Sequence, residues 1–113
     1  MAGQALRSHL ELMLLAVLAE APAHGYAVID SLRQRSGGHL DVPEGTLYPA
    51  LHRLERAGLV SSSWDPSAEA DGRRRRVYDL TPGGRDALRQ RRREWERFAA
   101  SMAGVLGETP DAQ

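Results

Sequence analysis

Residues 44–59 constrain the fold of this chain most strongly, because they combine an apolar helical face with groups that bind a polyanion. Leu47, Leu51 and Leu54 follow the i, i+4, i+7 spacing of a helix that buries one side. The other sides carry Thr46, Tyr48, His52, Arg53 and Arg56. Arginine, hydroxyl and imidazole groups on an exposed helix bind phosphate oxygens and base edges in a major groove. Gly58 is placed to end this helix, which we expect to start near residues 44–46.

A basic hairpin follows this helix. Residues 60–64 have the composition of a strand, residues 65–72 read as a loop, and residues 73–80 return as a second strand. In the returning strand, Arg76, Tyr78 and Leu80 share one side. The order predicts a winged helix-turn-helix, mostly α-helical with a small two-stranded β wing.

Four consecutive arginines open the returning strand, from Arg73 to Arg76. They crowd like charges on both faces of a strand, and contact with nucleic-acid phosphates relieves that repulsion. Arg73 and Arg74 lie nearest the loop, so we expect them to contact DNA, whereas Arg76 is suited to a structural role in the sheet. An ordinary solvated charge run is the alternative interpretation.

The N-terminal third of the chain predicts two more helices. Ser8 and Glu11 have the spacing of a capping box, which places a helix start at Ser8. This helix is apolar on two sides, so its own domain would cover one side and a second protomer the other. Its first apolar stripe comprises Leu10, Met13, Leu14, Val17 and Leu18. After Pro22, a second helix is expected over residues 24–35.

A last helix is expected from Thr81 and Pro82 onward, because a capping hydroxyl precedes proline at the first helical position. Leu88, Trp95 and Met102 are seven residues apart, and this seam has no obvious cover in a chain of 113 residues. We therefore expect a symmetric homodimer. Its predicted interface comprises Leu10, Leu14, Trp95, Phe98, Met102 and Val105. Two reading helices would then face half-sites about 34 Å apart, which predicts an inverted-repeat operator.

These elements divide the chain into four parts. They are an N-terminal arm (residues 1–8), a winged helix-turn-helix domain (residues 9–80), a C-terminal dimerisation helix (residues 81–107) and a loose tail (residues 108–113). The formal net charge is zero, so DNA binding has to come from local clusters of charge. The chain has no cysteine and no secretory signal, which fits a cytoplasmic protein that does not enter a membrane.

Metal and catalytic chemistry find no support in the sequence. The four histidines are widely separated, and there is no cysteine or paired-carboxylate spacing, so no metal or cofactor is expected. No nucleophile, phosphate-cradling glycine loop or acid–base pair is recognisable. We therefore do not expect an enzyme.

Several short motifs occur along the chain in a defined order. They are His24-Gly25-Tyr26, Thr46-Leu47-Tyr48-Pro49-Ala50-Leu51 with Arg53-Leu54-Glu55, Gly58-Leu59, Trp64, and residues 72–82. In this order and at these separations they resemble the PadR family of bacterial transcriptional regulators, over residues 10–106. The resemblance implies a winged-helix repressor that dimerises through its terminal helices and often responds to a small molecule.

The predicted contacts with double-stranded DNA come from the second helix, from the helix that Gly58 ends and from the hairpin. They are Tyr26, Thr46, Tyr48, His52, Arg53, Arg73 and Arg74. Tyr26, near the start of the second helix, has two interpretations: its phenol can donate to a phosphate at a helix N-terminus, or its ring can belong to the core. The family resemblance favours the phosphate contact.

Trp95 also has two interpretations. It can be an inert aromatic residue of the dimer interface, or the two copies can stack on a flat ligand in a central pocket. Multidrug-sensing members of the family are similar in having a tryptophan at the matching place. The residues expected to line such a pocket are Leu14, Val17, Trp95, Phe98 and Ala99. Cationic aromatic, anionic and phenolic ligands all remain open.

The sequence thus predicts a homodimeric repressor that binds an inverted-repeat operator and is released by a small aromatic or phenolic ligand. A winged-helix regulator that acts without a ligand is one alternative. A winged-helix interaction module whose basic surface binds an acidic protein is the other.

Overall fold

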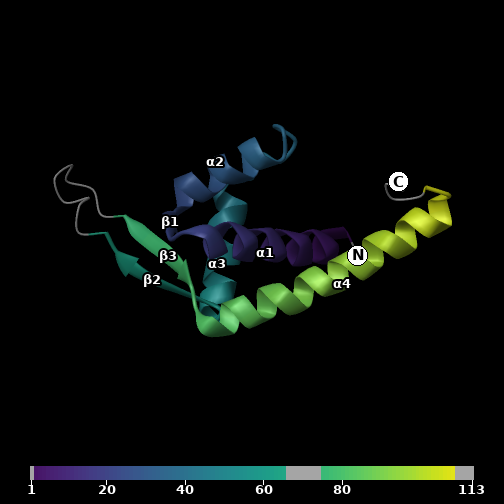
Figure 1. Cartoon of the computed structure of the whole chain (residues 1–113). Helices are drawn as coiled ribbons and strands as arrows, with labels where there is room; N and C mark the ends of the chain where they lie inside the picture. The colour runs from purple at the N-terminus through teal and green to yellow at the C-terminus, as the bar shows by residue number, and fades with distance from the viewer. Residues whose placement is uncertain (1, 66–74, 109–113) are drawn as a thin grey trace.

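The computed structural model describes residues 2–65 and 75–108, with side chains from residue 9 onward. In chain order its elements are α1 (Ala2–Glu20), β1 (Ala23–His24), α2 (Gly25–Arg35), α3 (Glu44–Arg56), β2 (Val60–Trp64), β3 (Arg76–Leu80) and α4 (Pro82–Leu106). The strands β2 and β3 project at one end of the molecule, and the last turns of α4 extend beyond the other (Figure 1). This mostly helical architecture with a small sheet is the predicted fold class.

The core forms around α1, which contacts α2, α3, β3 and α4. Leu14 and Leu15 of α1 are completely buried. From α3, Leu47, Leu51 and Leu54 enter the same core, as their helical spacing predicted. Because α3 is held by these three leucines, its opposite side faces solvent.

The start of α1 differs from the prediction. The helix begins at Ala2 rather than at Ser8, so its backbone continues through residues 2–8. The capping-box spacing of Ser8 and Glu11 misled the prediction, because the Glu11 carboxylate instead contacts arginines of α3 and α4. The division of the chain into an arm, a DNA-binding domain, a terminal helix and a tail stays a prediction.

The sheet has three strands in the order β1–β3–β2, one more than the predicted two-stranded wing. The strand β3 pairs antiparallel with β2 along its length, and Ala23 and His24 of β1 pair with its other edge. A strand of two residues directly before a helix is too short to show alternation, so hydrophobic periodicity could not reveal it. Tyr78 and Leu80 of β3 are buried, whereas Arg76 on the same side, near the strand's start, is exposed.

The helix α4 begins at the predicted cap. The Thr81 hydroxyl accepts a hydrogen bond from the Gly84 N–H at 3.0 Å and donates one to the Gly58 carbonyl at 2.7 Å. Pro82 occupies the first helical position, and Gly107 ends the helix with a φ of 79°, a left-handed value that favours glycine. The same hydroxyl therefore caps α4 and ties it to the turn that follows α3.

The second half of α4 projects from the body of the protomer (Figure 1). With this helix included, the protomer measures 55 × 32 × 29 Å along its three principal axes. Leu88 in the first half of the helix is buried, while Trp95, Phe98 and Met102 are exposed. The predicted seam is therefore open surface in the protomer from Trp95 onward. In the described ranges, none of the helices has the length and apolar content needed to cross a bilayer.

Two tyrosines connect the helices to the sheet. The Tyr48 ring packs over Gly25 at the start of α2, so closely that a Cβ on this glycine would lie 2.6 Å from the ring carbon Cζ. Burial first, and then the carboxylate of Glu44, raises the pKa of Tyr48. Burial is also the main reason that the pKa of Tyr78 is raised, followed by its proximity to Tyr48 and Glu55. Both phenols thus favour the neutral form in the folded state.

Two glycines of α4 provide a matched test of its packing. A Cβ on Gly84 would collide with the Leu59 carbonyl oxygen and lie 2.7 Å from Leu80 Cδ1, whereas a Cβ on Gly104 would meet nothing within 4 Å. Gly84→Ala should therefore lower the free energy of unfolding by about 1–3 kcal/mol. Gly104→Ala should raise it by about 0.5–1 kcal/mol, since alanine favours the helix. Urea unfolding at one protein concentration measures both, and equal effects would contradict close packing of Gly84.

Alkaline unfolding tests the environment of Tyr78, which is buried, and of Tyr48, which is partly buried. Because their pKa values are raised in the folded state, the unfolded chain releases these protons first, and the free energy of unfolding should fall as the pH rises above about 10. All fifteen basic residues are arginine, so no lysine titrates in this range. Tyr48→Phe and Tyr78→Phe should each reduce the loss, as measured by urea unfolding from pH 8 to about pH 11. Tyr26→Phe, which removes an exposed phenol, is the control.

Candidate nucleic-acid interface

The outer face of α3 is the centre of the candidate interface. Opposite its buried leucines, Gly45, Pro49, His52 and Arg56 form an exposed row with helical spacing. His52 lies here as predicted. Arg56 shares the row although it was not among the predicted contacts; its position four residues after His52 was the available signal. Because proline has no N–H, Pro49 leaves the Gly45 carbonyl without a helical donor, which adds an acceptor to this face.

Other predicted contacts lie on the two flanks of this row. Thr46 is exposed on one flank, next to Arg53. The Arg53 guanidinium is already engaged, because its Nε donates to Glu11 Oε2 at 3.1 Å. Tyr48 lies on the opposite flank and leans toward α2, so it is a packing residue between two helices. Direct DNA contacts by Thr46, Arg53 and Tyr48 stay predictions.

Tyr26 joins the N-terminal ends of α2 and α3. Its side chain is 60% exposed, so the interpretation of Tyr26 as a core residue is wrong. Its hydroxyl donates to Glu44 Oε2 at 3.0 Å. Glu44 is the first residue of α3, so its carboxylate lies at the N-terminus of this helix. An acidic group there interacts favourably with the helix dipole. The phosphate contact of Tyr26 remains a prediction.

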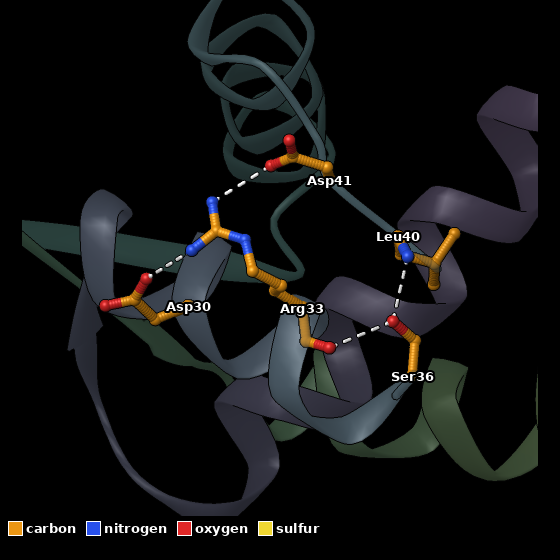
Figure 2. Close-up of polar contacts among 5 residues, drawn as sticks. All are labelled: Asp30, Arg33, Ser36, Leu40 and Asp41. Atoms are coloured by element: carbon orange, nitrogen blue, oxygen red, sulfur yellow. Dashed lines mark hydrogen bonds and ion pairs between the residues drawn. The ribbon is translucent and has the colours of Figure 1, made fainter. Parts of the chain in front are cut away.

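The connection between α2 and α3 is held by side-chain contacts (Figure 2). Arg33 bridges Asp30 at 3.1 Å and Asp41 at 2.9 Å, and the hydrogen bond with Asp41 is the main reason that the pKa of Arg33 is raised. The Ser36 hydroxyl donates to the Arg33 carbonyl at 3.1 Å and accepts from the Leu40 N–H at 2.9 Å. Exposed ion pairs contribute little individually. Together these contacts tie the C-terminal half of α2 to the connection that leads into α3.

The base of the wing is linked to the end of α3. Arg76 Nε donates to the Ser62 hydroxyl at 2.9 Å, and its guanidinium lies 4.6 Å from the ring centre of Trp64. The Ser62 hydroxyl in turn donates to Glu55 Oε2 at 2.8 Å. Arg76 therefore has the structural role predicted for it. The predicted contacts Arg73 and Arg74 lie outside the described residues.

A cleft of about 520 Å³ lies between α1 and α4. Its lining consists of His9, Glu11, Leu12, Arg91, Glu94, Trp95 and Phe98. The Trp95 ring stands edge-on to His9 at 5.5 Å and tilts against Phe98 at 5.9 Å, measured between ring centres. Ala99 is partly buried beside them. The cleft thus combines aromatic walls with groups of both charges.

Three residues predicted for the dimer interface or the ligand pocket are instead buried within the protomer. Leu14 is completely covered, Leu10 and Val17 are nearly so, and all three belong to the core. They lie in the core that α1 shares with the elements it contacts, which include α2 and α3. The surface that α1 offers to the cleft comes from His9, Glu11 and Leu12, which sequence reasoning missed because neighbouring leucines dominated the pattern.

Within the described residues, no three histidine or carboxylate side chains lie close enough together to hold a metal ion.

Comparison with known proteins agrees with this arrangement. Residues 14–90 match the transcriptional regulator PadR-like family. The chain is 40% identical over 103 residues to a transcriptional regulator of Mycobacterium tuberculosis, with 91% of each chain covered. It resembles the structure of a transcriptional regulator from Clostridium thermocellum with a TM-score of 0.80, at 26% identity over 92% of this chain and 96% of that one. A PadR-like transcription factor from Bacteroides fragilis gives 0.78, at 30% identity and the same coverage.

The match covers most of the chain, and the solved relatives share its winged-helix architecture. The protein therefore belongs to the PadR-like family of transcriptional regulators, which are DNA-binding proteins and not enzymes.

Proposed function

We propose that this regulator is a cytoplasmic homodimeric repressor that binds an inverted-repeat operator and is released by a small aromatic or phenolic ligand. The exposed apolar row on the projecting half of α4 carries the proposal. Trp95, Phe98, Met102 and Val105 are 44%, 49%, 44% and 85% exposed in the protomer. Such a row on a single helix is typical of an interface. A second copy, placed by a two-fold axis, would cover it with the same residues.

The two-fold axis determines how DNA would be read. Each protomer would present His52 and Arg56 on the outer face of α3, with Arg53 on its flank. Two such helices reach successive major grooves when they are about 34 Å apart. Because the dimer is symmetric, its operator should be an inverted repeat. The proposal that the protein represses transcription, rather than activates it, rests on its resemblance to the family.

The cleft beside Trp95 supports ligand binding. Its aromatic walls suit a flat ring, and Arg91 and Glu94 offer one charge of each sign. A ligand that binds there releases DNA only if it binds the DNA-free form more tightly than the DNA-bound form. The ligand must therefore change a contact on which the position or the DNA-binding groups of α3 depend.

The role of the wing can be tested through the salt dependence of DNA binding. If Arg73 and Arg74 contact phosphates, replacing both by alanine should reduce the slope of log affinity against log salt by about 0.9 for each lost contact. Arg92→Ala with Arg93→Ala, which removes the same charge from an exposed part of α4, should leave the slope unchanged. The measurement is fluorescence anisotropy with a duplex that the protein selects from a randomised pool.

Two results would count against this part of the proposal. Equal slopes for the wild type and the wing variant would remove the phosphate role of the wing. Failure of the wild type to select or shift any duplex would favour the protein-interaction module instead.

The dimer can be tested with two charges placed on opposite sides of α4. Met102→Asp buries an unpaired carboxylate in the proposed interface and should raise the dimer dissociation constant at least about a hundredfold, which corresponds to about 3 kcal/mol. Ala100→Asp places the same charge on the exposed opposite side and should leave the dimer intact. Sedimentation velocity measures both. A monomeric wild type, or a Met102→Asp variant that associates normally, would refute the interface.

A further inference from the structure

Glu11 connects the cleft to α3 through two ion pairs. Its Oε2 accepts from Arg53 Nε at 3.1 Å, and its Oε1 accepts from Arg91 Nη1 at 3.3 Å. The three residues belong to α1, α3 and α4, so one carboxylate joins the central helix to the DNA-reading helix and to the projecting helix. The Glu11 side chain is only 19% exposed.

The charges of this cluster make the two ion pairs interdependent. One carboxylate lies between two guanidinium groups, each bound to a different oxygen. Partial burial strengthens these interactions relative to pairs in open solvent. If either guanidinium moves away, the whole carboxylate charge becomes available to the other. The position of Arg53 on α3 is therefore sensitive to the position of Arg91 on α4.

The contact with Glu11 also prepares Arg53 for an anion. It engages Nε, and within the part of the chain that the structure describes, the terminal nitrogens of Arg53 have no partner. The side chain remains 37% exposed beside the outer face of α3. Holding Nε restricts the side-chain rotamers, so less conformational entropy is lost when the terminal nitrogens bind a phosphate.

The other side of Glu11 faces the cleft. Both Glu11 and Arg91 line it, together with Trp95. An occupant with a negative group would compete with Glu11 for Arg91, and one with a positive group would compete with Arg91 for Glu11. Either exchange changes how strongly Glu11 holds Arg53.

We propose that Glu11 is a positioning residue that makes the orientation of Arg53, and hence operator affinity, depend on what occupies the cleft beside Trp95. This inference rests on the proposed function, because it requires DNA binding by α3 and an occupant of the cleft. Coupling between two sites is reciprocal. Bound DNA must therefore change the affinity of the cleft for its occupant by the same factor.

The test measures this coupling directly in the full-length protein. The probe is 8-anilinonaphthalene-1-sulfonate, a fluorescent aromatic anion that the phosphates of DNA repel. Its affinity is measured with and without a saturating amount of the selected duplex. We expect bound DNA to change the affinity for the probe by at least about fivefold in the wild type. In Glu11→Gln, which keeps the shape of the side chain but removes its charge, the ratio of the two affinities should approach one.

Two further variants separate coupling from cleft affinity and from folding. Glu94→Gln changes the charge of the same cleft without touching the Arg53 contact, so it should keep the wild-type ratio whatever its effect on probe affinity. Arg91→Gln breaks the connection from the α4 side and should lower the ratio as Glu11→Gln does. It provides the answer if Glu11→Gln does not fold, as judged by circular dichroism.

The outcomes distinguish this inference from the proposed function. A wild-type protein that selects no duplex refutes the proposed function, and this inference with it. If DNA binding is intact, a wild-type ratio of one overturns the role of Glu11 alone, and so does a probe that does not bind to the wild type at all. A wild-type ratio retained in both Glu11→Gln and Arg91→Gln overturns it as well.

Discussion

The packing of the other elements around α1 determines where the outer face of α3 and the cleft beside Trp95 lie. Leu14 and Leu15 are completely covered, and burying one leucine side chain stabilises a fold by about 1.5–3 kcal/mol. Since α1 contacts α2, α3, β3 and α4, each of these elements must turn its apolar side toward it. The outer face of α3 is the side left over after Leu47 and Leu51 have been buried, so the same packing that stabilises the core also exposes His52 and Arg56.

Features set by local physics could be predicted from the sequence, and features set by distant contacts could not. The leucine spacing of α3 and the Thr81 cap of α4 depend on a few neighbouring residues, and both were predicted. Glu11 has a local capping-box spacing, yet its partners lie 42 and 80 residues away in the chain. Leu10 illustrates the same limit. Helical periodicity identifies an apolar side, but it does not say whether the same protomer or a second copy covers that side.

Although the formal net charge is zero, the arginines differ in what they contact. Carboxylates form ion pairs with arginines in the connection between α2 and α3 and between α1 and α3, as Asp41 does with Arg33 and Glu11 does with Arg53. Arg56 on the outer face of α3 has no such partner among the described residues. For DNA binding, the local distribution of charge therefore matters more than the total. Arginine suits such contacts because its planar guanidinium can donate to two acceptors in fixed directions, as that of Arg33 does to Asp30 and Asp41.

Glu11 also affects where a partner surface can begin on α4. Arg91 interrupts the heptad seam, and an unpaired guanidinium there would have to be desolvated when a second copy covers the helix. The Glu11 carboxylate forms an ion pair with Arg91 within the protomer, and the exposed apolar row begins at Trp95, four residues later. In the proposed dimer, one side chain would thus bear on both association and the orientation of Arg53. Binding equilibria that share an element are thermodynamically linked, so protomer association, cleft occupancy and DNA contact would respond to one another through α1.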